Sequence, residues 1–152
     1  MNIVLMSGIA GSGKSTYVKE NLLCPIVCSA DDYFMKDGKY CFDASKLSEA
    51  HGACLKKFVS YITGDLLSFG NNVPLVVDNT NLTALELAPY VTLANAYGFT
   101  PTIHTMKMHP NCAVIRNIHG VPIQSLNRMA DTLSKREIPR YWKVNIVNHD
   151  MN

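Results

Sequence analysis

Nine residues near the start of the chain restrict its fold more than any other feature. Residues 8–16 read GIAGSGKST and directly follow the apolar run at 3–6. They match the P-loop pattern G-x-x-x-x-G-K-S/T, in which glycines let the backbone curl so that N–H groups point at phosphate oxygens. Lys14 can reach the β- and γ-phosphates, and the Ser15 hydroxyl can ligate Mg²⁺. The pattern therefore predicts ATP and Mg²⁺ as ligands.

The surroundings of this loop favour the functional interpretation over an incidental glycine-rich turn. A short apolar strand precedes it, and a helical stretch from Thr16 to about Leu23 follows, which is the context the motif requires. The residues expected to hold the nucleotide are Gly8, Ala10, Gly11, Ser12, Gly13, Lys14, Ser15 and Thr16.

Length and composition bound the remaining possibilities. The 152 residues fit a single domain spanning 1–152, and 47% hydrophobic residues are enough for a proper core. No apolar run approaches the ~18 residues of a membrane span, and the start of the chain lacks the pattern of a secretory signal. The five cysteines are irregularly spaced, which predicts free thiols and no structural metal. We therefore expect a cytoplasmic protein, in a cell or in a virus-infected cell.

Apolar segments alternate with helical ones, which predicts an α/β fold with a parallel five-stranded sheet flanked by helices. The expected strands are Asn2–Ser7, Ile26–Ser29, Val73–Asp78, Thr102–Met108 and about Val144–Val147. Residues 35–41 are expected to form an exposed turn around Asp37-Gly38.

The helices are predicted from periodicity and end signals. One should run from about Ala44 to Phe69, with Asp43 as its N-cap and with Gly52 and Gly64 as points of weakness. Its expected buried stripe consists of Cys54, Phe58, Ile62 and Leu66.

Three further helices have recognisable starts. The sequence Thr83-Ala84-Leu85-Glu86 forms a capping box, and Gly98 is a suitable left-handed residue to end that helix. Pro110 and Pro122 each suit a first helical turn.

Two further strands end in acids. Asp31 and Asp32 follow the strand at 26–29, and Asp78 follows the run at 75–77. Because ligands gather at the carboxyl ends of parallel strands, these acids are expected near the P-loop. One of the Asp31–Asp32 pair could take a proton from an attacking hydroxyl, while the other could be only a helix N-cap or a surface turn residue. Asp78 occupies the place of a Walker B aspartate, which could hold Mg²⁺ or bond to a P-loop hydroxyl.

The C-terminal third carries a positive excess, with six basic and two acidic side chains between Cys112 and Lys143. Arg116 and Arg128 lie on either side of the short loop at 119–122, which suits a helical lid over about 112–136. His119 within that loop is a candidate phosphate or substrate contact. For Lys135 and Arg136 a solvated helical face is an equally good interpretation.

Four blocks of sequence together resemble the kinase domain of P-loop polynucleotide 5′-hydroxyl kinases, as found in T-even phages and animal DNA-repair enzymes. The blocks are 11–16 (GSGKST), 29–33 (SADDY), 76–82 (VVDNTNL) and the lid-like stretch 116–129. The resemblance covers nearly the whole chain, from Ile3 to about Met129. The first block is common to many NTPases, whereas the ordered set is much more specific.

This resemblance implies an ATP-dependent kinase that phosphorylates the 5′-hydroxyl end of DNA or RNA. The implied catalytic residues are Asp31 as general base, Lys14, Arg116 and Arg128, and the implied Mg²⁺ ligands are Ser15 and Asp78. Phe34 stands where phage members carry a substrate-holding arginine, and the lid is shorter. A small-molecule kinase on the same fold, or an ATP-binding ATPase or scaffold, therefore stays open as an alternative. The adenine-contacting residues are not evident, and Asn145 or its neighbours are only a guess.

Overall fold

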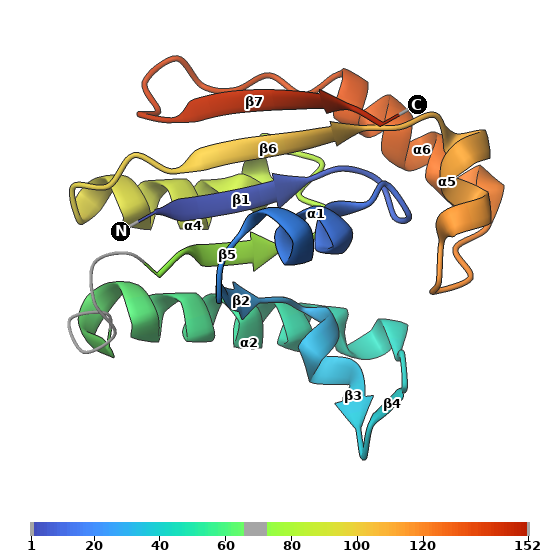
Figure 1. Ribbon diagram of the computed structural model, residues 1–152, viewed down its shortest axis with the longest axis horizontal. Helices are drawn as coiled ribbons and strands as arrows, with labels where there is room; N and C mark the ends of the chain where they lie inside the picture. Colours follow the sequence, from blue (N-terminus) through green and yellow to red (C-terminus); the bar gives the residue numbers. More distant parts are fainter. Residues whose placement is uncertain (1, 66–72, 152) are drawn as a thin grey trace.

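A five-stranded parallel sheet forms the centre of the computed structural model, which describes residues 2–65 and 73–151. Its strands run in the order β2-β5-β1-β6-β7 (Figure 1), and all four neighbouring pairs are parallel. The bounds are β1 (Ile3–Ser7), β2 (Ile26–Cys28), β5 (Leu75–Asp78), β6 (Thr102–Lys107) and β7 (Asn145–Asp150). The predicted parallel α/β sheet is thus confirmed, with strand ends shifted by a few residues.

Helices cover both faces of this sheet (Figure 1). Helix α1 (Lys14–Asn21) packs against Val4 and Met6 on one face, and α2 (Leu47–Ser60) and α4 (Ala84–Ala96) pack against Ile3 and Leu5 on the other. All five residues of β1 are buried, as expected of a central parallel strand covered on both sides. The loop that follows β1 is therefore attached to a fully buried strand at the centre of the sheet.

The single helix predicted from Ala44 to Phe69 is wrong in part. A 3₁₀ turn (η2, Ala44–Lys46) comes first, α2 follows, and a π-helical turn (η3, Tyr61–Asp65) ends the described segment. The Ser60 and Thr63 hydroxyls donate to the backbone carbonyls of Lys57 and Val59 at 2.8 Å, and such bonds compete with the regular α-helical ladder. The predicted end at Phe69, and Leu66 of its stripe, lie outside the described residues.

The predicted helix signals hold elsewhere. The side chain of Asp43 caps η2 by accepting from the Ser45 amide. At the start of α4, the Thr83 hydroxyl accepts from the Glu86 amide at 3.2 Å and the Glu86 carboxylate accepts from the Thr83 amide at 2.9 Å. Gly98 follows α4 with a φ of 80°, a conformation that favours glycine.

Two short helices lie across the carboxyl ends of the strands (Figure 1). They are α5 (Pro110–Arg116) and α6 (Ile123–Ser134), in the region predicted as a lid. Pro110 is the first residue of α5, as predicted, whereas Pro122 is the extended residue before α6 and not part of its first turn. A buried cluster holds the α5–α6 pair to the P-loop; its members are Ile9, Leu82, Met108, Ala113 and Leu126.

The predicted exposed turn at 35–41 is a short antiparallel hairpin. Its strands are β3 (Met35–Lys36) and β4 (Lys39–Tyr40), and Asp37 and Gly38 make the turn with positive φ. The hairpin projects from the body of the molecule beside the carboxyl end of β2 (Figure 1). Within the described ranges, none of the helices is both long and apolar enough to span a membrane.

Candidate active site

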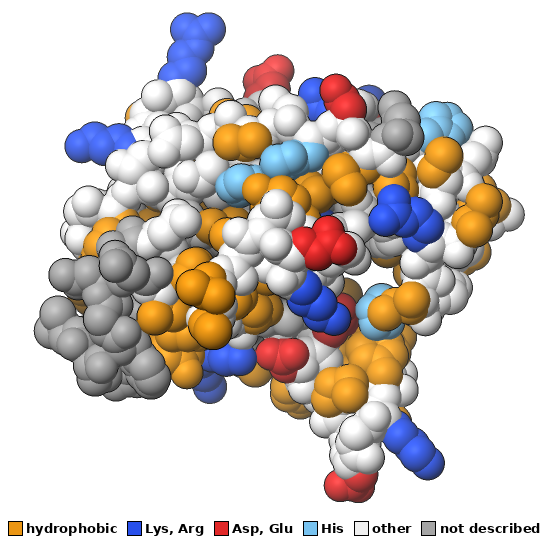
Figure 2. All heavy atoms as spheres, in the orientation of Figure 1, with side chains coloured by type: hydrophobic (Ala, Val, Ile, Leu, Met, Phe, Trp, Pro, Cys, Tyr) orange, Lys and Arg blue, Asp and Glu red, His pale blue; other side chains and the backbone are white. Residues whose placement is uncertain are grey.

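The P-loop and both predicted acid-bearing strand ends meet at one cavity of about 200 Å³. Figure 2 shows a hollow on this side of the molecule, between the β3–β4 hairpin and the α5–α6 pair, with charged side chains and a histidine at its border. The predicted site residues that line the cavity are Ala10, Gly11, Gly13, Lys14, Ser15, Thr16, Asp31, Asp78, Arg116 and His119. Arg128, in contrast, is an exposed residue of α6 outside the cavity lining.

The backbone of the P-loop is tightly packed, which explains two of its glycines. A Cβ atom on Gly8 would lie 2.6 Å from the Ser12 hydroxyl and 2.8 Å from the Met106 carbonyl oxygen. Gly11 has a φ of +77°, and a Cβ there would lie 2.4 Å from the Ala113 carbonyl oxygen in α5. Only glycine therefore permits both the curl of the loop and its close contact with the α5–α6 pair.

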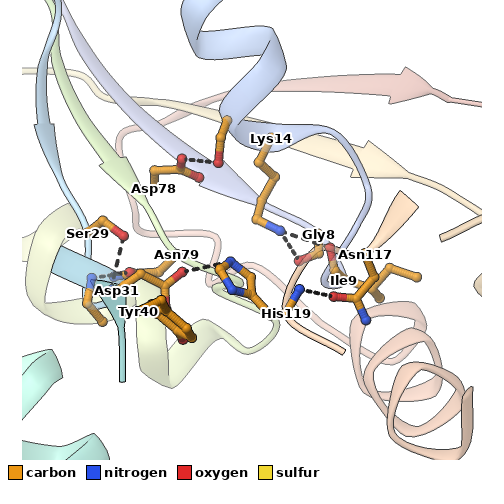
Figure 3. A network of polar contacts seen from close by, with 12 residues as sticks. Gly8, Ile9, Lys14, Ser29, Asp31, Tyr40, Asp78, Asn79, Asn117 and His119 are labelled. Carbon is orange, nitrogen blue, oxygen red and sulfur yellow. Dashed lines mark hydrogen bonds and ion pairs between the residues drawn. The ribbon is translucent and has the colours of Figure 1, made fainter. Parts of the chain in front are cut away.

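The half-buried side chain of Lys14 folds back onto this loop. Its ammonium group donates to the backbone carbonyls of Gly8 at 3.0 Å and Ile9 at 2.8 Å (Figure 3). Burial lowers the pKa of Lys14 to about 8, although the charges of Asp78 and Asp31 act in the opposite direction. The binding of an anion next to this ammonium group would stabilise its protonated form.

Two oxygen groups lie together beside the lysine. The Ser15 hydroxyl donates to Asp78 Oδ2 at 2.6 Å, which joins the start of α1 to the end of β5. Burial raises the pKa of Asp78, while the bond from Ser15 and the charge of Lys14 lower it. The structural and Mg²⁺-holding roles considered for Asp78 are both compatible with this geometry, because hydroxyl and carboxylate oxygens are what Mg²⁺ prefers.

Asp31 forms a bridge between the hairpin and the α5–α6 pair (Figure 3). The Tyr40 hydroxyl donates to Asp31 Oδ1 at 2.9 Å, and His119 Nε2 lies 3.7 Å from Asp31 Oδ2. The rings of Tyr40 and His119 are also in contact, with centroids 4.6 Å apart. Burial and the bond to Asp31 raise the pKa of Tyr40 to about 12, so its hydroxyl remains a donor at neutral pH. Oδ1 is thus held by Tyr40, whereas Oδ2 has only the longer contact with His119 and is the oxygen better placed to meet an incoming group.

Asp32 points to a different partner. Its carboxylate pairs with the Lys57 ammonium at 3.4 Å and is 60% exposed. Of the two roles suggested for the non-catalytic acid, the N-cap is wrong, because Ala30 caps the 3₁₀ turn η1 (Asp31–Phe34). The short turn places adjacent residues on different sides, so the two acids do not share one site.

Three important side chains were not identified from the sequence. Asn79 is buried and its Oδ1 accepts from the Ala30 amide at 2.9 Å, which fixes the chain just before Asp31.

Arg136 is half-buried and donates to the Ser7 hydroxyl, to Thr105 Oγ1 at 2.8 Å and to the Asn81 carbonyl at 2.9 Å. A solvated face is therefore wrong for Arg136, whereas Lys135 is exposed and pairs with Asp131. Tyr40 lies in the segment 35–41, which the sequence predicted only as an exposed turn.

The structure also gives the positions of two other residues that the sequence suggested for the site. The guanidinium of Arg116 lies against the P-loop, with Nη2 3.6 Å from where a Gly13 Cβ would stand. Asn145 is the first residue of β7, at the end of the sheet opposite the P-loop, a position that does not favour a contact between Asn145 itself and adenine.

Nucleotide affinity is expected to fall as the pH rises through about 8, because Lys14 then loses the proton that pairs with phosphate. Bound phosphate favours the charged lysine, so binding above this pH takes up a proton and the logarithm of affinity falls by up to about one unit per pH unit. Calorimetry of AMPPNP binding between about pH 7 and about pH 9.5, in two buffers with different ionisation enthalpies, measures both effects. A constant affinity without proton uptake would contradict this description of Lys14.

Gly11→Ala is expected to damage the nucleotide site, and Gly38→Ala is its matched control. Both glycines have a φ of +77°, but a Cβ at Gly38 would meet nothing within 4 Å. Gly38→Ala should lower the free energy of unfolding by about 1–2 kcal/mol through left-handed backbone strain, and Gly11→Ala by more, because its Cβ also meets the Ala113 carbonyl oxygen. Only Gly11→Ala should also displace α5, with at least about tenfold weaker AMPPNP binding. Equal nucleotide affinity in the two variants would show that the contact with Ala113 is unimportant.

Comparison with known proteins identifies the family of this chain and a much longer relative. The sequence profile of a family described as "AAA domain" matches residues 3–119. Human NEDD4-binding protein 2 is 33% identical over 140 residues, which represent 85% of this chain and 7% of that protein. The chain thus corresponds to a small part of that relative.

Solved structures of kinases have the same fold. A sugar kinase from Janibacter sp. HTCC2649 aligns with a TM-score of 0.59 at 12% identity, covering 97% of this chain and 85% of that one. The APS kinase CysC of Mycobacterium tuberculosis, in complex with AMPPNP and APS, aligns with a TM-score of 0.56 at 13% identity, covering 99% and 90%. The fold is that of P-loop kinases. Because the matched profile covers more than half of the chain, the protein belongs to this family of AAA domains (AAA_33).

Proposed function

We propose that this protein is an ATP-dependent polynucleotide kinase, which transfers the γ-phosphate of ATP to a 5′-hydroxyl end of DNA or RNA. One observation carries the proposal: Lys14 and Asp31 line the same cavity, one from the P-loop and the other from the end of β2. A phosphate-binding cation and an acid that can accept a proton are the two groups that transfer to an alcohol requires.

The proposed reaction divides the work among these side chains. The acceptor oxygen attacks the γ-phosphorus, the bond from that phosphorus to the bridging oxygen breaks, and ADP leaves. Asp31 Oδ2 takes the hydroxyl proton, while Tyr40 holds Oδ1 and fixes the direction of the carboxylate. Lys14 and Arg116 neutralise charge on the transferring group. Mg²⁺ held by Ser15 and Asp78 would supply further neutralisation of the phosphates.

The free site has to open for this reaction. A cavity of about 200 Å³ is below the ~300–1,000 Å³ typical of small-molecule sites. Two features narrow it: Lys14 is folded back on the P-loop carbonyls, and the Tyr40–Asp31–His119 bridge crosses the acceptor side. We infer that nucleotide draws the lysine toward phosphate and that the acceptor separates His119 from Asp31.

The exposure of the acid supports a polymer end as the acceptor. The Asp31 side chain is 55% exposed, although the cavity is narrow near Lys14. A kinase for a small metabolite must enclose its acceptor to exclude water, whereas the end of a nucleic acid covers the acid with its own bulk. The ordered sequence blocks shared with polynucleotide kinases support the same acceptor.

A small-molecule kinase is the second candidate. It is favoured by the fold, which this chain shares with a sugar kinase and an APS kinase. The Lys and Arg side chains on the face shown in Figure 2 are also separated from one another and do not form one uninterrupted stripe. Fold alone does not select the acceptor.

The experiment is transfer of label from γ-labelled ATP to a panel of acceptors. The panel contains DNA and RNA oligonucleotides with 5′-hydroxyl ends, the same oligonucleotides with 5′-phosphate ends, nucleosides and sugars. We expect label on the 5′-hydroxyl oligonucleotides alone, with a reaction that weakens steeply as salt rises, since phosphate contacts release counterions. Label on nucleosides or sugars, with little dependence on salt, would select the small-molecule kinase.

A further inference from the structure

A second cavity of about 610 Å³ lies along β6 and β7, next to α6. None of its lining residues lines the P-loop cavity. Its volume is within the ~300–1,000 Å³ of sites that hold small molecules. It touches the nucleotide site at one point, because the side chain of Ile9 lines it while the Ile9 carbonyl accepts from Lys14.

All the ionisable side chains that line this cavity are basic. The ionisable side chains among its lining residues are Lys107, His109 and Arg136, and no carboxylate is among them. Lys107 and His109 are exposed at its edge, and Arg136 is half-buried. An anion entering the cavity would therefore meet basic side chains, while the neighbouring acids Glu137 and Asp150 are not among the lining residues.

Arg136 lacks a close counter-charge. The hydrogen bonds of its guanidinium end on neutral oxygens, those of Ser7, Asn81 and Thr105. It takes part in none of the ion pairs of the described residues. Burial lowers the pKa of Arg136 more than the charge of Glu86 raises it, and the Glu86 carboxylate is itself held by the cap of α4. A partly buried cation without an anion costs free energy that a bound anion would offset.

The rest of the lining is apolar. Leu133 and Ile138 contribute from α6 and the segment after it, and Ile146 contributes from β7. Ile146 is 48% exposed despite its place on a strand, so this part of the wall is open to a ligand. The combination of apolar wall and basic end is suited to an amphipathic anion, not to free inorganic phosphate.

We propose that this second cavity binds an organic anion, with its carboxylate, sulfonate or phosphate ester toward Lys107 and Arg136 and its apolar body against Leu133, Ile138 and Ile146. The site is separate from the proposed phosphate transfer and does not depend on it. Because Ile9 lines this cavity and its carbonyl accepts from Lys14, an occupied cavity would also support the P-loop.

The test uses a matched pair of probes, naphthalene-2-sulfonate and the neutral naphthalene-2-sulfonamide. Calorimetry measures their binding to the whole chain with AMPPNP and Mg²⁺ present, so that the P-loop site is occupied. We expect saturable binding of the sulfonate that is at least about fivefold tighter than that of the sulfonamide. Lys107→Gln should weaken the sulfonate by about two- to fivefold, the range of an exposed charge pair, whereas Lys19→Gln on α1 should not.

A second pair of variants tests the apolar wall. Ile146→Trp should fill the cavity and reduce sulfonate affinity at least about tenfold. Val147→Trp is its control, because successive residues of a strand point to opposite faces. Thermal unfolding of each variant shows whether the fold is kept. If either tryptophan variant is unstable, the comparison of Lys107→Gln with Lys19→Gln tests the proposal instead. Equal binding of the two probes, no saturable binding, or equal effects of Lys107→Gln and Lys19→Gln would overturn the proposal.

Discussion

Lys14→Ala is expected to reduce phosphate transfer at least about 10³-fold, the largest effect that we predict for a single substitution. The ammonium group of Lys14 is the one cation that the P-loop holds beneath its own carbonyls, at 2.8 and 3.0 Å. Without this ammonium group, the negative charge on the transferring phosphoryl group loses its nearest positive partner. Single-turnover transfer from γ-labelled ATP measures the loss.

The fold is expected to survive this change. Burial of the Lys14 ammonium disfavours its charged form, as its lowered pKa indicates, so removal of the charge relieves a cost in the free protein. Lys19→Ala is the matched control, since Lys19 is an exposed lysine of the same helix. Similar losses of transfer in both variants, or near-normal transfer in Lys14→Ala, would contradict the role of Lys14 in phosphate neutralisation.

Asp31→Asn is expected to lower kcat for transfer at least about 10²-fold while leaving AMPPNP affinity nearly unchanged. The amide keeps the shape of the side chain and can still accept from Tyr40, but it cannot take a proton from the acceptor. The separation between kcat and nucleotide affinity distinguishes a base from a residue that only shapes the cavity. Rapid-quench kinetics and calorimetry give the two quantities.

Asp32→Asn is the natural control, because it changes the adjacent acid in the same way. Asp32 pairs with Lys57 on the surface, and an exposed pair of this kind contributes about 0–1 kcal/mol. Transfer by Asp32→Asn should therefore remain within about threefold of the unsubstituted protein. An inactive Asp32→Asn beside an active Asp31→Asn would reverse the assignment within the pair.

The parts of this molecule that local sequence determines were predictable. The P-loop pattern needs only its own glycines and lysine, and the apolar runs at 3–6 and 75–77 are long enough to identify buried parallel strands. The capping box at Thr83 is likewise a contact between residues three positions apart. The order of the strands then brought Asp31 and Asp78 to the same edge, as the general rule for parallel sheets predicts.

Contacts between distant segments could not be predicted. Arg136 donates to Ser7 across 129 positions of sequence, and no local pattern distinguishes it from its exposed neighbour Lys135. The Tyr40–Asp31–His119 bridge depends on how a hairpin and a helix pair are placed in space. The role of Arg128 stays a prediction: its position after a lid-like loop suggested a site residue, and α6 places it outside the lining of the cavity.

The most direct test of the proposed chemistry is to follow the γ-phosphate of ATP in a single turnover with a 5′-hydroxyl oligonucleotide. We predict that the label appears on the oligonucleotide as a phosphate ester, in a reaction that requires both Lys14 and Asp31. Release of all the label as inorganic phosphate, at a rate unaffected by Asp31→Asn, would contradict transfer to an alcohol at this site.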